Sequence, residues 1–184
     1  ATPTALMVGI GKAADHHILI KDAYALETLC KVDTIVLDKT GTLTEGIPVV
    51  VDSCWLTESN VCYLDILYTA ELKSEHPLAS AIIRWLEDSG ASTCEAGNFE
   101  SLTGRGIRME VNGVTYWVGS HGLLEVFGSE IPDDTMKQIR KWQDNGISVV
   151  YYGEGNRLLA VLAISDRIKP TSAAAVKTLT DMGI

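Results

Sequence analysis

The spacing of apolar residues divides the chain into short segments of two kinds. Apolar or β-branched runs predict strands at residues 18–21, 32–37, 47–56, 108–111, 114–118, 147–152 and 158–164. Apolar residues at helical spacing, with cap residues at their ends, predict helices at residues 1–14, 22–30, 57–73, 77–89, 120–127, 132–145 and from 170 onward. The pattern of apolar residues therefore predicts a fold that contains both helices and strands.

Most of these strands are predicted to pair as hairpins. Asn112-Gly113 stands between two strand-like runs, and Asn-Gly is a strong signal for a two-residue hairpin turn. A glycine-rich turn at residues 153–156 joins the last two strands. Hairpin strands with helices between them are typical of an antiparallel α+β unit, which here covers about residues 46–163.

The chemistry is expected at Asp38, where the apolar run 32–37 ends. A buried strand would place this carboxylate at a strand's carboxyl end, where open α/β sheets hold their ligands. Aspartate is a known covalent nucleophile toward phosphorus. Lys39 adds a positive charge, and the hydroxyls of Thr40 and Thr42 can donate hydrogen bonds to phosphoryl oxygens. The alternative is an ordinary polar turn after a strand.

Residues 38–44, Asp-Lys-Thr-Gly-Thr-Leu-Thr, resemble the phosphorylation signature of the P-type ATPases, which are cation pumps. The resemblance implies an α/β fold: a partial haloacid-dehalogenase-like (Rossmann-like) phosphorylation domain with an inserted α+β nucleotide-binding domain on an antiparallel sheet. It also implies catalytic roles for Asp38, Lys39, Thr40 and Thr42. Phosphatases of that superfamily carry an aspartate at the position of Thr40. A hydroxyl is a poor proton donor or acceptor near neutral pH, so an aspartyl phosphate here is expected to resist hydrolysis.

A second resemblance concerns nucleotide binding. The tetrapeptide Ser-Glu-His-Pro at residues 74–77, with Glu71 five residues before His76, resembles the adenine site of heavy-metal pumps. The family also has a Gly-x-Gly and a later Val-Gly pair. The residues implied to contact ATP are Glu71, His76, Gly104, Gly106 and Gly119. The alternative for the tetrapeptide is simple capping of a helix, with Ser74 as the cap.

The first residues favour a particular subfamily. Residues 1–5, Ala-Thr-Pro-Thr-Ala, resemble the segment that follows a Cys-Pro-Cys motif in copper(I) pumps, and they favour copper(I) over zinc or cadmium. The resemblance implies that residues 1–45 begin the phosphorylation domain, with 1–14 as the cytoplasmic end of a membrane helix. Residues 46–163 are then the nucleotide-binding domain, and residues 164–184 start the truncated second part of the phosphorylation domain.

The return to the phosphorylation domain is expected at residues 165–170. There Asp166 and Lys169 belong either to a hinge or to a loop ion pair, which would contribute little. The sequence contains no Thr-Gly-Asp and no Gly-Asp-Gly-x-Asn-Asp, the family segments that supply magnesium carboxylates. The resemblance implies that Mg²⁺ binds Asp38 and the Thr40 carbonyl together with a carboxylate from elsewhere. The chain alone is expected to bind ATP without turnover.

The net charge and the cysteine spacing limit which binding partners are expected. The net charge of −9 argues against nucleic acid as a partner. The four cysteines have no metal-finger spacing, and free thiols in a reducing cytosol are expected. The implied setting is the cytoplasmic part of an integral membrane protein. Its partners are ATP and the pump's remaining phosphorylation, actuator and transmembrane domains, and the transported ion does not bind here. Two alternatives remain: a soluble haloacid-dehalogenase-like phosphatase and a non-catalytic nucleotide-binding module.

Overall fold

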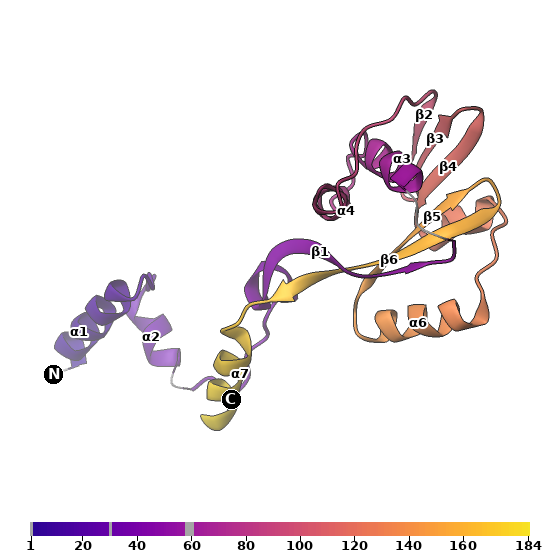
Figure 1. Cartoon of the computed structure of the whole chain (residues 1–184). Coiled ribbons are helices and arrows are strands. Elements are labelled where there is room, and N and C mark those ends of the chain that lie inside the picture. The colour runs from indigo at the N-terminus through magenta and orange to yellow at the C-terminus, as the bar shows by residue number, and fades with distance from the viewer. Residues whose placement is uncertain (1, 30, 58–60) are drawn as a thin grey trace. The chain divides into compact units, whose positions relative to one another are not determined.

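The computed structural model describes residues 2–29, 31–57 and 61–184. The chain forms two compact units (Figure 1). One contains residues 1–39 and 169–184, and the other contains residues 40–168. The second unit is larger and carries the sheet.

The smaller unit is helical. Its helices are α1 (Thr2–Asp15), α2 (Ala23–Leu29) and α7 (Ser172–Asp181), close to the predicted ranges. Asp22 begins α2 as expected, because its Oδ1 accepts a hydrogen bond from the Ala25 N–H at 2.7 Å. Cys30, the predicted last residue of this helix, lies outside the described residues.

Two predicted strands in the smaller unit do not form. Residues 18–21 and 32–37 have no regular secondary structure, and Val36 is 94% exposed. An apolar run becomes a strand only where a neighbouring strand pairs with its backbone N–H and C=O groups. The sheet that the structure describes includes neither segment. The prediction that Asp38 ends a buried strand is therefore wrong for this chain.

The larger unit is built on one sheet of six antiparallel strands, in the order β1-β6-β5-β4-β3-β2. The strands are β1 (Thr44–Trp55), β2 (Phe99–Leu102), β3 (Gly106–Val111), β4 (Val114–Gly119), β5 (Ser148–Glu154) and β6 (Arg157–Ile168). The hairpin at Asn112-Gly113 is confirmed, and both residues have positive φ, as a type I′ turn requires. Pro48 lies in β1 at the sheet's edge, where proline's missing N–H is tolerated.

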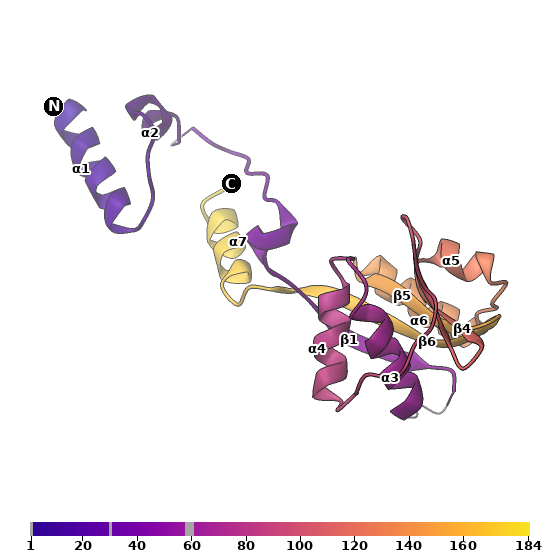
Figure 2. The ribbon, with the colours of Figure 1, turned by 90° about the horizontal axis from the view of Figure 1, so that it is seen from above.

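Helices cover both faces of this sheet (Figure 2). On one face α3 (Val61–Glu71) and α4 (Ala79–Asp88) pack through Leu67, Ile82 and Leu86. On the other face α5 (His121–Val126) and α6 (Asp133–Asp144) pack through Leu123 and Trp142. Successive β6 residues from Ala160 to Ile164 alternate between the two cores, as a strand buried on both faces must.

Several element ends differ from the predictions. Helix α3 ends at Glu71, whereas the prediction continued to residue 73, and residues 58–60 of its predicted start lie outside the described residues. Strand β6 continues to Ile168, so Asp166 lies within a strand and not in a loop. The segment Lys39–Leu43 forms a single irregular turn, in which Gly41 has a φ of 78°. Glycine suits this conformation because it lacks a Cβ atom.

Candidate functional site

A pocket of about 370 Å³ lies within the larger unit, where the end of α3, the start of α4 and the strands β3 and β4 meet. The five residues that the resemblance assigned to ATP all line this pocket: Glu71, His76, Gly104, Gly106 and Gly119. They come from segments almost 50 residues apart in the sequence, and the antiparallel sheet brings them together. That they contact a nucleotide stays a prediction.

Glu71 is the last residue of α3, and it is only 4% exposed. Burial raises the pKa of its carboxyl from 4.5 to about 7, because the charged form loses water, while a hydrogen bond with Ser74 acts in the opposite direction. The neutral and ionised carboxyl are therefore both populated near neutral pH. Both forms keep an oxygen that can accept a hydrogen bond from a ligand amine.

The side chain of His76 is exposed, and His76 forms hydrogen bonds with two residues close to it in the sequence. Its Nδ1 accepts a hydrogen bond from the Leu78 N–H at 3.2 Å, and the Ser74 hydroxyl accepts one from the His76 N–H at 3.3 Å. An accepting Nδ1 carries no proton, so the neutral ring carries its hydrogen on Nε2. The ring therefore presents one N–H donor and one flat face to a ligand.

Ser74 is not the cap of α4. The residue at the cap position of that helix is Leu78, and no side chain caps it with a hydrogen bond. The Ser74 hydroxyl instead lies between the two implied adenine contacts, because it contacts the Glu71 carboxyl and the His76 N–H. The capping alternative for the Ser-Glu-His-Pro tetrapeptide is thus not what the structure shows.

The three glycines of the pocket have a clear backbone role. A Cβ atom on Gly106 would overlap the Val118 carbonyl oxygen, and one on Gly119 would overlap the Arg105 carbonyl oxygen. The backbones of β3 and β4 thus approach each other too closely for any side chain at these two positions. Gly104 differs: it has a φ of 70°, and a Cβ there would meet open space. Two of the three glycines are therefore required by strand packing, whatever binds in the pocket.

Sequence reasoning missed the apolar wall of the pocket. This wall consists of Ile82, Ile107, Val118 and Val150. Ile82, Val118 and Val150 belong to a predicted helix or strand, so periodicity could have placed them on the inner face, whereas Ile107 lies just before the predicted strand at residues 108–111. Hydroxyl groups at the rim were also missed, and they belong to Ser101, Thr103 and Ser120. Arg105 also lines the pocket and is exposed.

The four predicted catalytic residues of the phosphorylation signature are divided between the two units. Asp38 and Lys39 belong to the smaller unit, and Thr40 and Thr42 belong to the larger one. All four side chains are exposed. Within the described parts of the chain, no three side chains of His, Cys, Asp or Glu form a group that could hold a metal ion. The catalytic and metal roles predicted for these residues stay predictions.

Cysteines and apolar helices give two further observations. Cys54, Cys62 and Cys94 are free thiols, as expected, while Cys30 lies outside the described residues. None of the helices in the described ranges is long and apolar enough to cross a membrane.

Comparison with known proteins shows the family to which this chain belongs. Residues 32–184 match the family model for haloacid dehalogenase-like hydrolases. A probable cadmium-transporting ATPase of Listeria monocytogenes is 37% identical over all of this chain and 27% of its own length. A copper-exporting P-type ATPase of Vibrio cholerae is 40% identical over all of this chain and 20% of its own length.

The fold agrees with these relatives. A zinc-transporting PIB-type ATPase, crystallised in its E2.Pi state, matches 99% of this chain and 29% of its own with a TM-score of 0.80 and 30% identity. The chain spans only about a quarter of the length of the curated relatives that it matches. The resemblance and the fold class predicted from the sequence are confirmed. The chain belongs to the haloacid dehalogenase-like hydrolases, and its relatives among them are the heavy-metal-transporting P-type ATPases.

Proposed function

We propose that this chain is the nucleotide-binding and phosphorylation region of a heavy-metal-transporting P-type ATPase that forms an aspartyl phosphate on Asp38. The observation that carries the proposal is that Glu71, His76 and the three glycines all line one pocket. The sequence similarity to ATPases and the intact signature at residues 38–44 support the proposal that Asp38 is phosphorylated. Copper(I) is the transported ion that the sequence at residues 1–5 favours.

The pocket suits the adenine and ribose of ATP. An exocyclic amine can donate to the Glu71 carboxyl, and the His76 Nε2–H can donate to a ring nitrogen, or its ring can stack on the base. The apolar wall beside them excludes water from the flat faces of a purine. The overall charge of −9 makes these local donors necessary, since a triphosphate gains nothing from the protein's net field.

In the phosphoryl transfer, a carboxylate oxygen of Asp38 attacks the γ-phosphorus of ATP. The new bond joins this oxygen to phosphorus, the bond from phosphorus to the β,γ-bridging oxygen breaks, and ADP leaves with that oxygen. Lys39 and the hydroxyls of Thr40 and Thr42 supply positive charge and hydrogen-bond donors for the transferred group. Thr40 offers no carboxylate to activate water, so the acyl phosphate persists.

Magnesium fits these residues only in part. The Asp38 carboxylate and the Thr40 carbonyl are oxygen donors of the kind that Mg²⁺ prefers. Among the described residues, no three side chains of His, Cys, Asp or Glu form a group that could hold the ion without further ligands. Bound with ATP, the ion would neutralise phosphate charge, and further carboxylates of a longer protein would have to complete its shell.

The further parts of the proposal concern the setting. The chain works as the cytoplasmic part of a membrane pump, beside the remaining phosphorylation, actuator and transmembrane domains, and the transported ion does not bind here. The large share of its relatives' length that lies outside the match supports such partners. The chain alone binds ATP without turnover and accumulates no acid-stable phosphate on Asp38.

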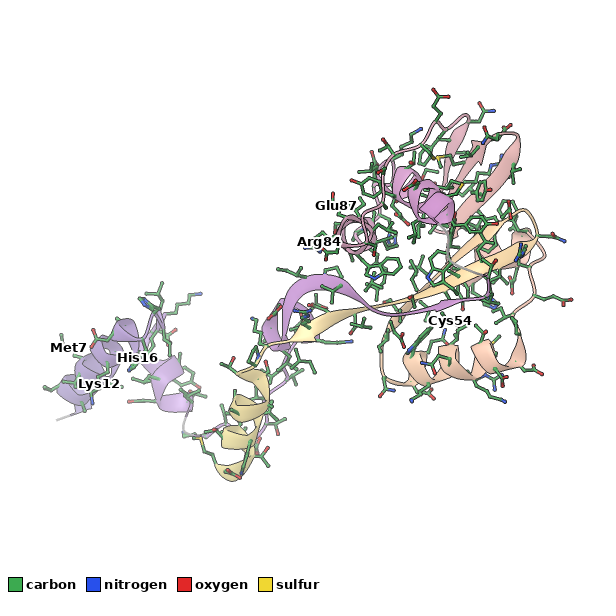
Figure 3. All side chains as sticks on the ribbon, viewed as in Figure 1. Met7, Lys12, His16, Cys54, Arg84 and Glu87 are labelled. Atoms are coloured by element: carbon green, nitrogen blue, oxygen red, sulfur yellow. The ribbon has the colours of Figure 1, made fainter. Side chains whose placement is uncertain are left out.

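Isothermal titration calorimetry with ATP tests the nucleotide site. His76→Ala is expected to weaken binding about tenfold, because it removes both a donor and a stacking face. His16→Ala is the matched control, since His16 is an exposed histidine of the smaller unit (Figure 3). Equal ATP affinity of the wild type and the His76→Ala variant would contradict the assignment of the adenine site to His76.

A further inference from the structure

One carboxylate holds the start of β1 to the end of β6. Asp166 on β6 accepts hydrogen bonds from the Thr44 hydroxyl, from the Gly46 N–H at 3.1 Å and from the Ile47 N–H at 3.0 Å. These partners lie about 120 residues before Asp166 in the sequence. Hydrogen bonds to a carboxylate are about twice as strong as bonds between neutral groups. The contact thus holds the first residues of β1 against the last residues of β6.

The register of the two strands explains why a side chain is needed here. Thr44 pairs with Ile168 and Pro48 pairs with Asp166, with an irregularity between these two pairs. Three residues of β1 therefore face one residue of β6, and the regular ladder is interrupted. The Asp166 carboxylate accepts the N–H groups of Gly46 and Ile47 at this point, as a backbone carbonyl would in a regular ladder.

Thr44 extends the contact into the phosphorylation signature. Its side chain is almost fully buried, and its hydroxyl accepts a hydrogen bond from the Gly41 N–H at 3.1 Å. The hydroxyl has one hydrogen, which it donates to Asp166. The direction of the chain of bonds is therefore fixed: from Gly41 N–H to the Thr44 hydroxyl, and from the Thr44 hydroxyl to the Asp166 carboxylate. Only an acceptor at position 166 is compatible with it.

A contact from the pocket side reaches the same point of β1. Arg84 of α4 donates a hydrogen bond to the Pro48 carbonyl oxygen at 3.0 Å, and Pro48 is the register partner of Asp166. Arg84 lies on α4 beside Glu87 (Figure 3). Helix α4 begins three residues after His76, and Ala79 and Ile82 of this helix line the pocket. The wall of the pocket and the Asp166 contact are thus joined by one helix and one strand.

We propose that Asp166 is a positioning residue for the phosphorylation loop: through the Thr44 hydroxyl it holds the Gly41 N–H, and it thereby fixes the turn after Asp38 on β1 and β6 of the sheet whose other strands line the nucleotide pocket. The proposal rests on the proposed function, because the loop has a catalytic role only if Asp38 is phosphorylated. Asp166 touches neither substrate nor the reacting atoms. Its effect is on the conformation of the turn at residues 40–43.

Amide hydrogen exchange, measured by nuclear magnetic resonance on the whole 184-residue chain, tests the contact. Thr44→Val keeps the shape of the side chain but removes the hydroxyl, and it is expected to speed exchange at Gly41 about tenfold. Thr44→Ser keeps the hydroxyl and is expected to restore the wild-type rate. Asp166→Asn is expected to speed exchange at Gly46 and Ile47. The amide of Val161, in the centre of the sheet, should not change in any variant.

Equal Gly41 exchange in the valine and serine variants would overturn the proposal. Uniform faster exchange, including Val161, would also overturn it, because it would show a general loss of stability and not a local contact.

A second assay separates this proposal from the proposed function. In the full-length protein, Asp166→Asn is expected to slow formation of acid-stable phosphoenzyme about tenfold or more, with the KM for ATP unchanged. An unchanged rate would overturn the positioning role. If the wild-type protein and an Asp38→Asn variant are equally unlabelled, the proposed function fails, and the exchange results at Gly41 still decide whether the contact exists.

Discussion

Replacing Glu71 by glutamine is expected to change how stability depends on pH. The carboxyl of Glu71 is buried at the end of α3, and burial raises its pKa from 4.5 to about 7. A group with a raised pKa binds its proton more tightly in the folded state than in the unfolded chain. Its contribution to stability is therefore complete below pH 4.5 and is lost as the pH rises through about 7.

The magnitude follows from the two pKa values. Each pKa unit corresponds to about 1.4 kcal/mol, so ionising Glu71 in the folded protein costs about 3 kcal/mol at high pH. Between pH 5 and pH 8 the wild type should lose about 2.5 kcal/mol of unfolding free energy through this group alone. Glutamine has nearly the same shape and does not titrate, so Glu71→Gln should not show this loss. This is a large effect for one side chain.

The assay is urea denaturation of both proteins at a series of pH values, with the free energy of unfolding as the readout. The difference between the variant and the wild type should grow by about 2.5 kcal/mol from pH 5 to pH 8. Glu75→Gln is the control, because Glu75 lines the same pocket but is exposed, and its curve should follow the wild type. Parallel curves for Glu71→Gln and the wild type would refute the reasoning.

Three other outcomes are expected. ATP should bind the wild type more weakly as the pH falls below about 7, because the ionised Glu71 is the better acceptor for an amine, and Glu71→Gln should lose this dependence in calorimetry. Gly106→Ala should lower the free energy of unfolding by about 2 kcal/mol or more, since its Cβ meets the Val118 carbonyl, while Gly104→Ala should cost only about 1 kcal/mol in the same urea assay. Leu86→Ala should cost about 2–5 kcal/mol through the cavity that it leaves under α4, and a loss below 1 kcal/mol would contradict the packing.

The sequence determined the features that depend on neighbouring residues. The hairpin at Asn112-Gly113 needs two consecutive residues with positive φ, and the residue types alone supply them. Asp22 at the start of α2 and Gly90 after α4 mark helix ends for equally local reasons. The signature at residues 38–44 identified the family, because its residue order is specific without any knowledge of the fold.

Prediction from the sequence was wrong where a strand can form only by pairing with another strand. Residues 32–37 have the composition of a buried strand, yet the described chain pairs them with no other strand, and Val36 is exposed. The apolar character of a run says that burial is favourable, but it does not say what will cover it. For the same reason the predicted place of Asp38 at a strand end was wrong.

Only the tertiary structure decided how distant residues act together. It brought Glu71 and His76 to the glycines of β3 and β4 in one pocket, and it buried the Glu71 carboxyl enough to raise its pKa. It also placed Asp166 against Thr44, which the sequence offered only as part of a hinge or a loop ion pair. The physical reason is common to these cases. Residue identity fixes which hydrogen bonds and charges a side chain can offer, but desolvation and long-range pairing depend on which strands the folded sheet places side by side.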